Sequence, residues 1–281
     1  MLESKTIKQI SDFVYIKPRT IQEIAHLINK NWRTADRYVA KMIEETGSLS
    51  IRTLRGGTRG ALKIVFWNNA EKIHSQEFQE RLFTRIERSV RKNDFSPFDI
   101  YQHVDPKKRQ AYLVEEKDEK IVIDKDLFSL LRSAQKHIFF FSGNVSWVSI
   151  IDDEKALIDV LEDLPSSIAI KVLTKVDITS RNNVTKLMRI NEAKGKEMIE
   201  IRHCEQPLRG IIIDSRIARF REIKDPGDYK RGELDRKTYI YYEINDPDWV
   251  EWLEKVFWKQ FRTANLAKKR LESLDTIENL Y

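Results

Sequence analysis

The chain has 281 residues, 41% hydrophobic and 33% charged, so it is long enough for two globular domains with packed cores. Its net charge is +6, from 50 Lys and Arg against 44 Asp and Glu. No apolar run reaches the roughly 18 residues of a membrane-spanning helix, and the polar start lacks a signal peptide, so we expect a cytoplasmic protein with no membrane partner. A single cysteine, Cys204, excludes an intrachain disulfide and a thiolate zinc cluster.

The positive charge is concentrated in the first quarter of the chain. Residues 1–69 hold 12 Lys and Arg against 6 Asp and Glu, so they carry the whole excess and the remaining residues are electrically balanced. A basic module joined to a neutral one indicates nucleic-acid binding combined with a second task.

The basic part has the pattern of three helices and a hairpin. Apolar residues at helical spacing predict helices over 4–15, about 21–29, and 31–45. Thr20, followed three residues later by Glu23, has the pattern of a capping box at the start of the second helix. Alternating apolar residues then predict two strands joined by a basic, glycine-rich tip. This is the order of a helix-turn-helix followed by a wing.

The third helix is the predicted reader of DNA, because the second helix of a helix-turn-helix lies in the major groove. Arg33 and Arg37 are four residues apart, so both side chains can enter one groove and bond guanine, while Lys41 suits a phosphate. The predicted DNA contacts are Asn31, Trp32, Arg33, Thr34, Arg37 and Lys41 in the helix, and Arg55, Thr58 and Arg59 in the wing. The alternatives are a winged helix that binds protein, with solvated charges, and a Trp32 that caps the domain core.

The rest of the chain predicts an amphipathic helix and then alternating helices and strands. An apolar stripe runs through residues 70–92 and indicates packing or a dimer seam, whereas the very polar residues 105–120 predict a linker or an exposed turn region. Helices and strands alternate from about residue 122, and one aromatic-rich helix is expected over 247–274. This alternation predicts an α/β layer fold with a mixed sheet.

Two stretches resemble known families. NWRTADRYVAKMIEETG, between a capped helix and a glycine-rich hairpin, resembles the winged helix-turn-helix of archaeal transcription regulators over residues 4–67. Residues 122–265 resemble one half of a phospholipase D fold, through AQKHIFFFSGNVSWV, IKVLTK and IEIRHCEQPLRGIIID. The combination resembles the TrmB-like archaeal regulators, some of which bind sugars.

The phospholipase D signature, His-x-Lys-x4-Asp, is degenerate here. When the signature is aligned on Asp214, Pro207 stands at the position of the nucleophilic His and Arg209 at that of the phosphate-binding Lys. Proline is neither nucleophile nor base, so the resemblance implies a domain without catalytic residues. Phospholipase D enzymes assemble one site from two signatures, so a chain with one half implies a homodimer.

These observations predict a multi-domain α/β protein with an N-terminal winged helix-turn-helix and a C-terminal phospholipase D-like, mixed-sheet domain. The predicted parts are the DNA-binding domain (1–69), a helical linker or dimerisation segment (70–121), the phospholipase D-like domain (122–267) and a C-terminal helix end and tail (268–281). The predicted function is a homodimeric transcription regulator that binds specific double-stranded DNA sequences. The alternatives are a nuclease with a DNA-targeting domain and a non-specific DNA-architecture protein.

A few further residues are candidates for binding a small ligand or a metal ion. Arg202 and Arg209 are candidates for binding a small anionic effector. The histidines have no metal-ligand spacing, and the acidic run 152–154 is typical of a helix start, so we expect no metal and no cofactor.

Overall fold

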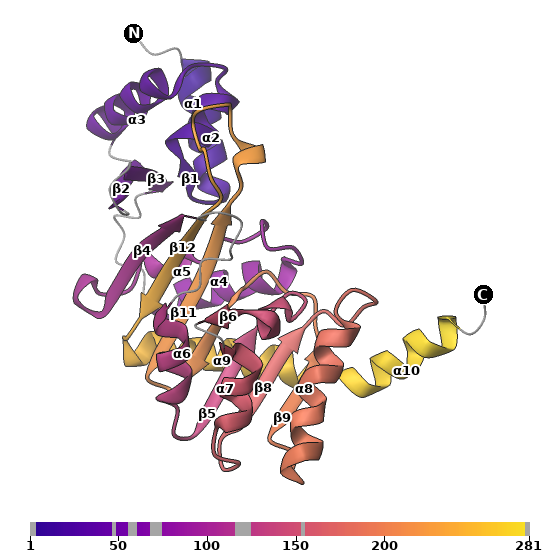
Figure 1. Cartoon of the computed structure of the whole chain (residues 1–281). Helices are drawn as coiled ribbons and strands as arrows, with labels where there is room; N and C mark the ends of the chain where they lie inside the picture. Colours follow the sequence, from indigo (N-terminus) through magenta and orange to yellow (C-terminus); the bar gives the residue numbers. More distant parts are fainter. Residues whose placement is uncertain are drawn as a thin grey trace.

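The computed structural model describes residues 4–46, 49–55, 61–67, 75–115, 125–152 and 155–278. A small N-terminal domain stands on one end of a larger α/β domain, and helix α10 projects from the far side of the larger domain (Figure 1). The expected fold class, a multi-domain α/β protein with a mixed sheet, is confirmed.

The N-terminal domain contains the predicted helices and hairpin. Its three strands form an antiparallel sheet in the order β1-β3-β2. The elements are α1 (Ser4–Ile16), β1 (Arg19–Thr20), α2 (Ile21–Leu27), α3 (Trp32–Thr46), β2 (Leu49–Arg55) and β3 (Ala61–Trp67). Apolar residues from all three helices meet strands β2 and β3 in one core, so the helical periodicity identified the buried faces.

Local side-chain and backbone chemistry marks the start of α2 and the turn that follows it. Thr20 caps α2, since its hydroxyl accepts from Glu23 N at 3.2 Å while the Glu23 carboxylate accepts from Thr20 N at 2.7 Å. The predicted capping box is therefore confirmed. Asn29 has a φ of 51°, a left-handed conformation that asparagine tolerates, and it turns the chain between the two helices.

The larger domain is built on an eight-stranded mixed sheet in the order β13-β9-β8-β5-β10-β11-β12-β4. Strands β5, β8 and β9 run parallel, and the other neighbouring pairs are antiparallel. The strands are β4 (Arg109–Glu115), β5 (His137–Phe141), β8 (Ala169–Thr174), β9 (Ile199–His203), β10 (Gly210–Ile213), β11 (Ile217–Lys224), β12 (Thr238–Ile244) and β13 (Asn265–Leu266).

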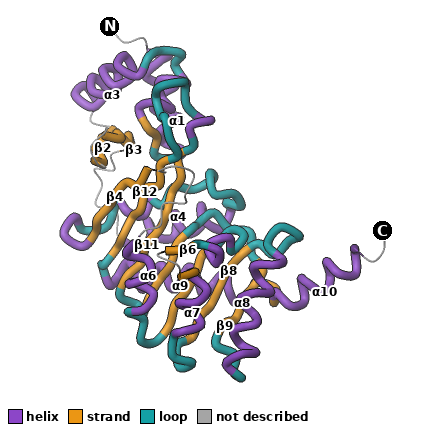
Figure 2. The backbone as a smooth tube through the Cα atoms, in the orientation of Figure 1, coloured by secondary structure: helices purple, strands orange, loops and turns teal. Residues whose placement is uncertain are grey.

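Helices pack on both faces of this sheet (Figure 2). On one face lie α6 (Lys125–Arg132), α7 (Leu157–Asp163) and α8 (Arg181–Lys194), and on the other lie α4 (Ser75–Arg88) and α9 (Pro247–Thr263). The shorter elements are α5 (Phe98–Tyr101), η1 (Pro106–Lys108), η2 (Ser146–Ser149), β6 (Ile151–Asp152), β7 (Lys155–Ala156) and η3 (Pro226–Asp228), and α10 (Ala267–Glu278) ends the described chain. After His137, strand β5 is apolar because alternate side chains enter the two cores.

Two expectations about this domain are wrong. The polar stretch expected to be a linker contains β4, an edge strand that pairs along its whole length with β12. The residues of an edge strand stay half exposed, so β4 lacks the apolar signal of a central strand. The single C-terminal helix is instead two helices, α9 and α10, because the chain becomes extended at Ala264 and adds β13 to the sheet.

Candidate nucleic-acid interface and basic cavity

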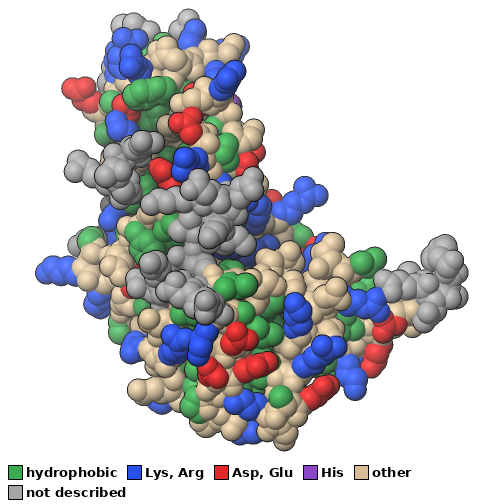
Figure 3. Space-filling view, in the orientation of Figure 1, with side chains coloured by type: hydrophobic (Ala, Val, Ile, Leu, Met, Phe, Trp, Pro, Cys, Tyr) green, Lys and Arg blue, Asp and Glu red, His purple; other side chains and the backbone are tan. Residues whose placement is uncertain are grey.

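Helix α3 presents a basic face at the end of the molecule that is farthest from the large sheet. Ala35, Val39 and Met42 are fully buried, whereas Arg33 and Arg37 are exposed on the opposite side. Lys and Arg side chains gather over α3 at the top of the space-filling view (Figure 3). The structure thus brings the two predicted guanine-reading arginines onto one accessible face.

The other predicted contacts on α3 differ in what they do in this structure. Asn31 caps the helix, because its side-chain oxygen accepts from Thr34 N at 2.9 Å. Trp32 is 43% exposed, so it does not fill the domain core, and the Arg33 guanidinium lies 5.5 Å from its ring centre. Thr34 and Lys41 are half-buried at the edge of the face.

The wing meets the larger domain. The side chain of Arg55 and all of Thr58 and Arg59 lie outside the described residues, so their predicted DNA contacts stay predictions. Leu54 of β2 pairs with Leu62 of β3 near the tip of the hairpin, and both side chains are buried. They share a core with larger-domain residues, Phe98, Tyr101, Ile240 and Tyr242. The described part of the hairpin is therefore anchored against α5 and β12.

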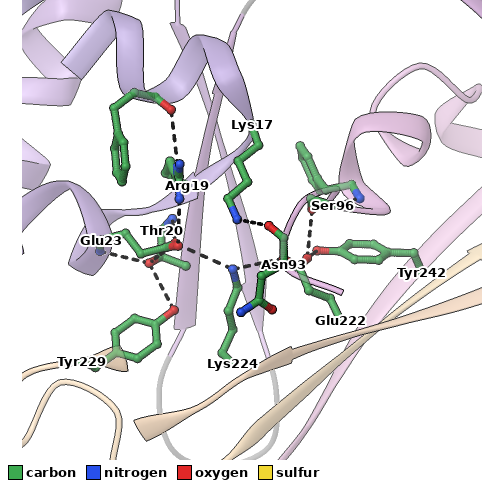
Figure 4. Close-up of polar contacts among 12 residues, drawn as sticks. Lys17, Arg19, Thr20, Glu23, Asn93, Ser96, Glu222, Lys224, Tyr229 and Tyr242 are labelled. Carbon is green, nitrogen blue, oxygen red and sulfur yellow. Dashed lines mark hydrogen bonds and ion pairs between the residues drawn. The ribbon is translucent and has the colours of Figure 1, made fainter. Parts of the chain in front are cut away.

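Partly buried charges tie the two domains together next to this apolar contact (Figure 4). The Lys224 ammonium lies 3.7 Å from the Glu23 carboxylate in the N-terminal domain and 3.1 Å from the Glu222 carboxylate in its own strand. Tyr242 and Ser96 donate to the second oxygen of Glu222, at 3.0 and 3.1 Å. Glu23 therefore both caps α2 and contacts the larger domain.

The pKa values in this network show how strongly it is coupled. Burial alone would lower the pKa of Lys224, but Glu222 and Glu23 raise it above its ordinary value. Burial would raise the pKa of Glu23, but Lys224 and the hydrogen bonds from Thr20 hold it below its ordinary value. The pair is thus charged at neutral pH, and each partner neutralises the other inside the interface.

A basic cavity of about 930 Å³ opens beside this interface, on the face of strands β10, β11 and β12. Its described lining holds six Lys and Arg side chains and two carboxylates. Arg209 and Arg221 lie side by side across neighbouring strands, because Arg221 N donates to Arg209 O at 2.7 Å, one step beyond the pair Gly210–Phe220.

The Arg209 guanidinium is pressed against the chain at Gly143. A Cβ at Gly143 would lie 2.8 Å from Nε of Arg209, so only glycine leaves this space free. Nη1 donates to the carbonyl oxygens of Gln206 and Leu208, both at 2.7 Å. Burial, together with the nearby Arg221, lowers the pKa of Arg209 to about 10.

The two predicted effector arginines are not brought together. Arg202 is not among the described residues that line the cavity, and its guanidinium bonds Glu200 at 2.8 Å and the carbonyl oxygen of Phe261 at 3.0 Å. It holds the end of α9 against β9. The cavity arginine that the sequence analysis missed is Arg221, which the register of the β10–β11 hairpin would have placed opposite Arg209.

The remaining polar candidates have structural partners. The Asp214 carboxylate accepts from three successive backbone N–H groups, of residues 135–137, at 2.7 to 2.9 Å. Nδ1 of His203 accepts from Val176 N at 2.9 Å, and burial raises the pKa of the Cys204 thiol to about 11. Within the described ranges, no group of three His, Cys, Asp or Glu side chains is arranged to hold a metal ion.

Pro207 is buried and lines a smaller cavity of about 80 Å³ between the domains, together with Glu23, Glu222 and Lys224. Arg209 and Arg221 line this cavity as well as the larger one. The position that the phospholipase D resemblance gives to the nucleophile is thus packed against the domain interface.

No family model matches the chain, and neither does any curated protein. Among solved structures it is similar to TrmBL2, an archaeal chromatin protein, at 14% identity over 94% of both chains, with a TM-score of 0.39. It is also similar to the phospholipase D family member Nuc from Salmonella typhimurium, at 12% identity over 57% of this chain and 98% of that one, with a TM-score of 0.39. NucT from Helicobacter pylori is 10% identical over 57% and 99%, also with a TM-score of 0.39. No described helix is long and apolar enough to cross a membrane.

Proposed function

We propose that the protein is a transcription regulator that binds specific sequences of double-stranded DNA as a homodimer. The observation that carries the proposal is the exposed face of α3, on which Arg33 and Arg37 stand free of the domain core. A helix with two arginines four residues apart can place both in one major groove and contact neighbouring guanines.

Two features support DNA as the partner. Asp36, which lies beside Arg37 on α3, is neutralised by Lys63 at 2.7 Å, so it repels phosphate less than a free carboxylate would. The basic excess lies in the domain that carries α3, while the larger domain is neutral overall. A second copy would present a second α3, which suits a site with two-fold symmetry.

The test is retardation of genomic fragments selected for binding to the wild-type protein. Replacing Arg33 and Arg37 together by Ala should abolish retardation, because each lost bidentate contact costs about 1–3 kcal/mol. Arg189→Ala is the matched control, since Arg189 is exposed on α8 in the neutral domain. Undiminished binding of the double variant to these fragments would refute the proposal.

The non-specific architectural role is distinguished by comparing selected and random duplexes at one salt concentration. A regulator should prefer its own site by about a thousandfold or more, whereas an architectural protein binds both alike. A symmetric consensus among the selected fragments, bound by two copies of the chain, would support the homodimer.

We further propose that the larger domain performs no phospholipase D-type cleavage. Pro207 offers neither a nucleophile nor a base, and it is buried against the domain interface. The check is a metal-free cleavage assay on plasmid DNA. Cleavage that disappears in His203→Ala would favour the nuclease instead.

A further inference from the structure

The strongest unexplained feature is the pair of arginines in the basic cavity. Arg209, immediately before β10, lies across from Arg221 of β11, one step beyond the pair Gly210–Phe220, and like charges placed across from each other in a sheet are destabilising. The fold maintains this contact in a partly buried place, so the unfavourable repulsion needs an offsetting interaction.

Three other charged groups in the lining, Arg219, Lys175 and Asp94, are already offset by protein groups, and Arg91 and Lys92 are exposed to solvent. Arg219 donates to the Glu243 carboxylate, with Nε at 2.9 Å, and Lys175 lies 3.3 Å from Glu205. The Asp94 carboxylate accepts from the backbone N–H groups of residues 90 and 91, at 3.0 and 2.7 Å.

The two arginines differ from these groups. Within the described residues, the Arg209 side chain donates to backbone carbonyl oxygens, and the Arg221 guanidinium lies 5.5 Å from the centre of the Tyr239 ring. Within the described part of the chain, no carboxylate forms an ion pair with either guanidinium. Two partly buried guanidinium groups thus face one cavity, and neither is paired with a carboxylate of the described residues.

We propose that this cavity binds a small phosphorylated molecule, with its phosphate between Arg209 and Arg221. Two guanidinium groups offer several donors in planar forks, which match the oxygens of a phosphate dianion and offset both charges at once. At about 930 Å³ the cavity is far larger than one phosphate and lies in the range of sites for small organic ligands.

The shape of the rest of the cavity indicates where the organic part lies. Phe140 and Trp147 stack at 4.3 Å along one wall, and Trp147 is held by a hydrogen bond from Nε1 to Ser142 Oγ at 3.0 Å. Tyr241 lines the same cavity. An apolar or aromatic group attached to the phosphate would contact these rings, so a mononucleotide is a suitable probe.

In the experiment, inorganic phosphate and AMP are each titrated into the full chain, and binding is measured by calorimetry and by tryptophan fluorescence. We expect saturable binding of at least one probe. Arg221→Gln should weaken it about tenfold or more, because a charge-assisted contact to the phosphate is lost. Arg209→Gln should do the same, and Arg189→Gln, on the outer side of α8, should leave it unchanged.

Trp147→Phe adds a second readout. This variant keeps the stacked wall, so it should retain calorimetric binding while losing the fluorescence change that the ligand causes. If Arg209→Gln fails to fold, as judged by its thermal transition, Arg221→Gln alone decides. Binding of neither probe at millimolar concentration, or binding that Arg221→Gln leaves intact, would overturn the proposal. DNA is absent from this experiment, so its outcome is independent of the proposed DNA binding.

Discussion

Gly143 leaves the space that the Arg209 guanidinium occupies. A methyl group there would meet Nε at 2.8 Å and Nη2 at 2.9 Å, so the arginine has to move. Because the contacted atoms lie at the end of a long side chain, the chain can relieve the clash by rotating the guanidinium into the cavity rather than by shifting the backbone.

Gly143→Ala should therefore change ligand binding more than stability. We expect the affinity for inorganic phosphate or AMP to fall about tenfold, because the guanidinium loses its orientation, while the free energy of unfolding changes by less than about 1 kcal/mol. Calorimetry and denaturant unfolding measure the two quantities. A variant that binds the probe as tightly as the wild type would show that the position of Arg209 does not matter.

The charge state of Asp99 affects the contact between helices α5 and α4. It lies in α5, is almost fully buried and accepts from Nη2 of Arg85 in α4 at 2.7 Å, while Arg85 also donates to Ile16 O at the end of α1. Burial raises the pKa of Asp99 to about 7, although Arg85 acts in the opposite direction. At a pH between 3.8 and about 7, the Asp99 carboxyl is therefore protonated in the folded protein and ionised in the unfolded chain.

This shift has a defined sign in the pH dependence of stability. The stabilising contribution of Asp99 to the free energy of unfolding is complete below its unfolded pKa of about 3.8 and is lost as the pH rises to about 7. The wild type should therefore lose stability relative to Asp99→Asn between pH 4 and 7, and the difference should be constant above that range. Denaturant unfolding at several pH values measures it, and parallel curves for the two proteins would contradict the assignment.

At the scale of elements, the sequence predicted those parts whose signal is local. Periodicity located the helices of the N-terminal domain, and the capping box at Thr20 marked the start of α2. Strand β5 was found because both of its faces are buried and its residues after His137 are continuously apolar. Strand β4 was missed because pairing with β12, a contact with a distant part of the chain, makes it a strand.

The residues of the candidate site also divide into those that local spacing predicts and those that depend on distant contacts. The exposed face of α3 follows from helical spacing alone, so Arg33 and Arg37 were found. The pairing of Arg209 with Arg221 depends on the hairpin register, which a turn with left-handed Asp214 and Ser215 fixes. The burial of Pro207 depends on how the domains dock, and no local pattern encodes that.

At the scale of the whole molecule, strand β11 joins the two proposed sites. Its residues alternate, so that Arg221 lines the basic cavity while Glu222 and Lys224 reach the charged network of the interface. Lys224 meets Glu23, which caps the first helix of the helix-turn-helix. A ligand that moves β11 would thus act on the element that orients α3.

This connection predicts reciprocal coupling between the ligand and DNA. Saturating AMP, or phosphate if AMP does not bind, should change the DNA affinity by a factor of about 5 or more, and DNA should change the ligand affinity by the same factor. Fluorescence anisotropy with labelled DNA and calorimetry of the ligand measure the two factors. Unequal factors would mean that the two measurements do not report the same equilibrium.

Lys224→Met tests whether the interface carries this coupling. Methionine keeps much of the side-chain volume but leaves Glu23 and Glu222 without their cation, so the charged network no longer joins the domains, while the apolar contact of the wing strands with α5 remains. Each ligand should still bind its own site, and the coupling factor should fall toward one. Lys268→Met, exposed on α10, is the control and should keep the wild-type factor. A Lys224→Met protein with undiminished coupling would place the communication in another contact between the domains, such as the apolar contact of the wing strands with α5 or the pair of His26 with Glu233.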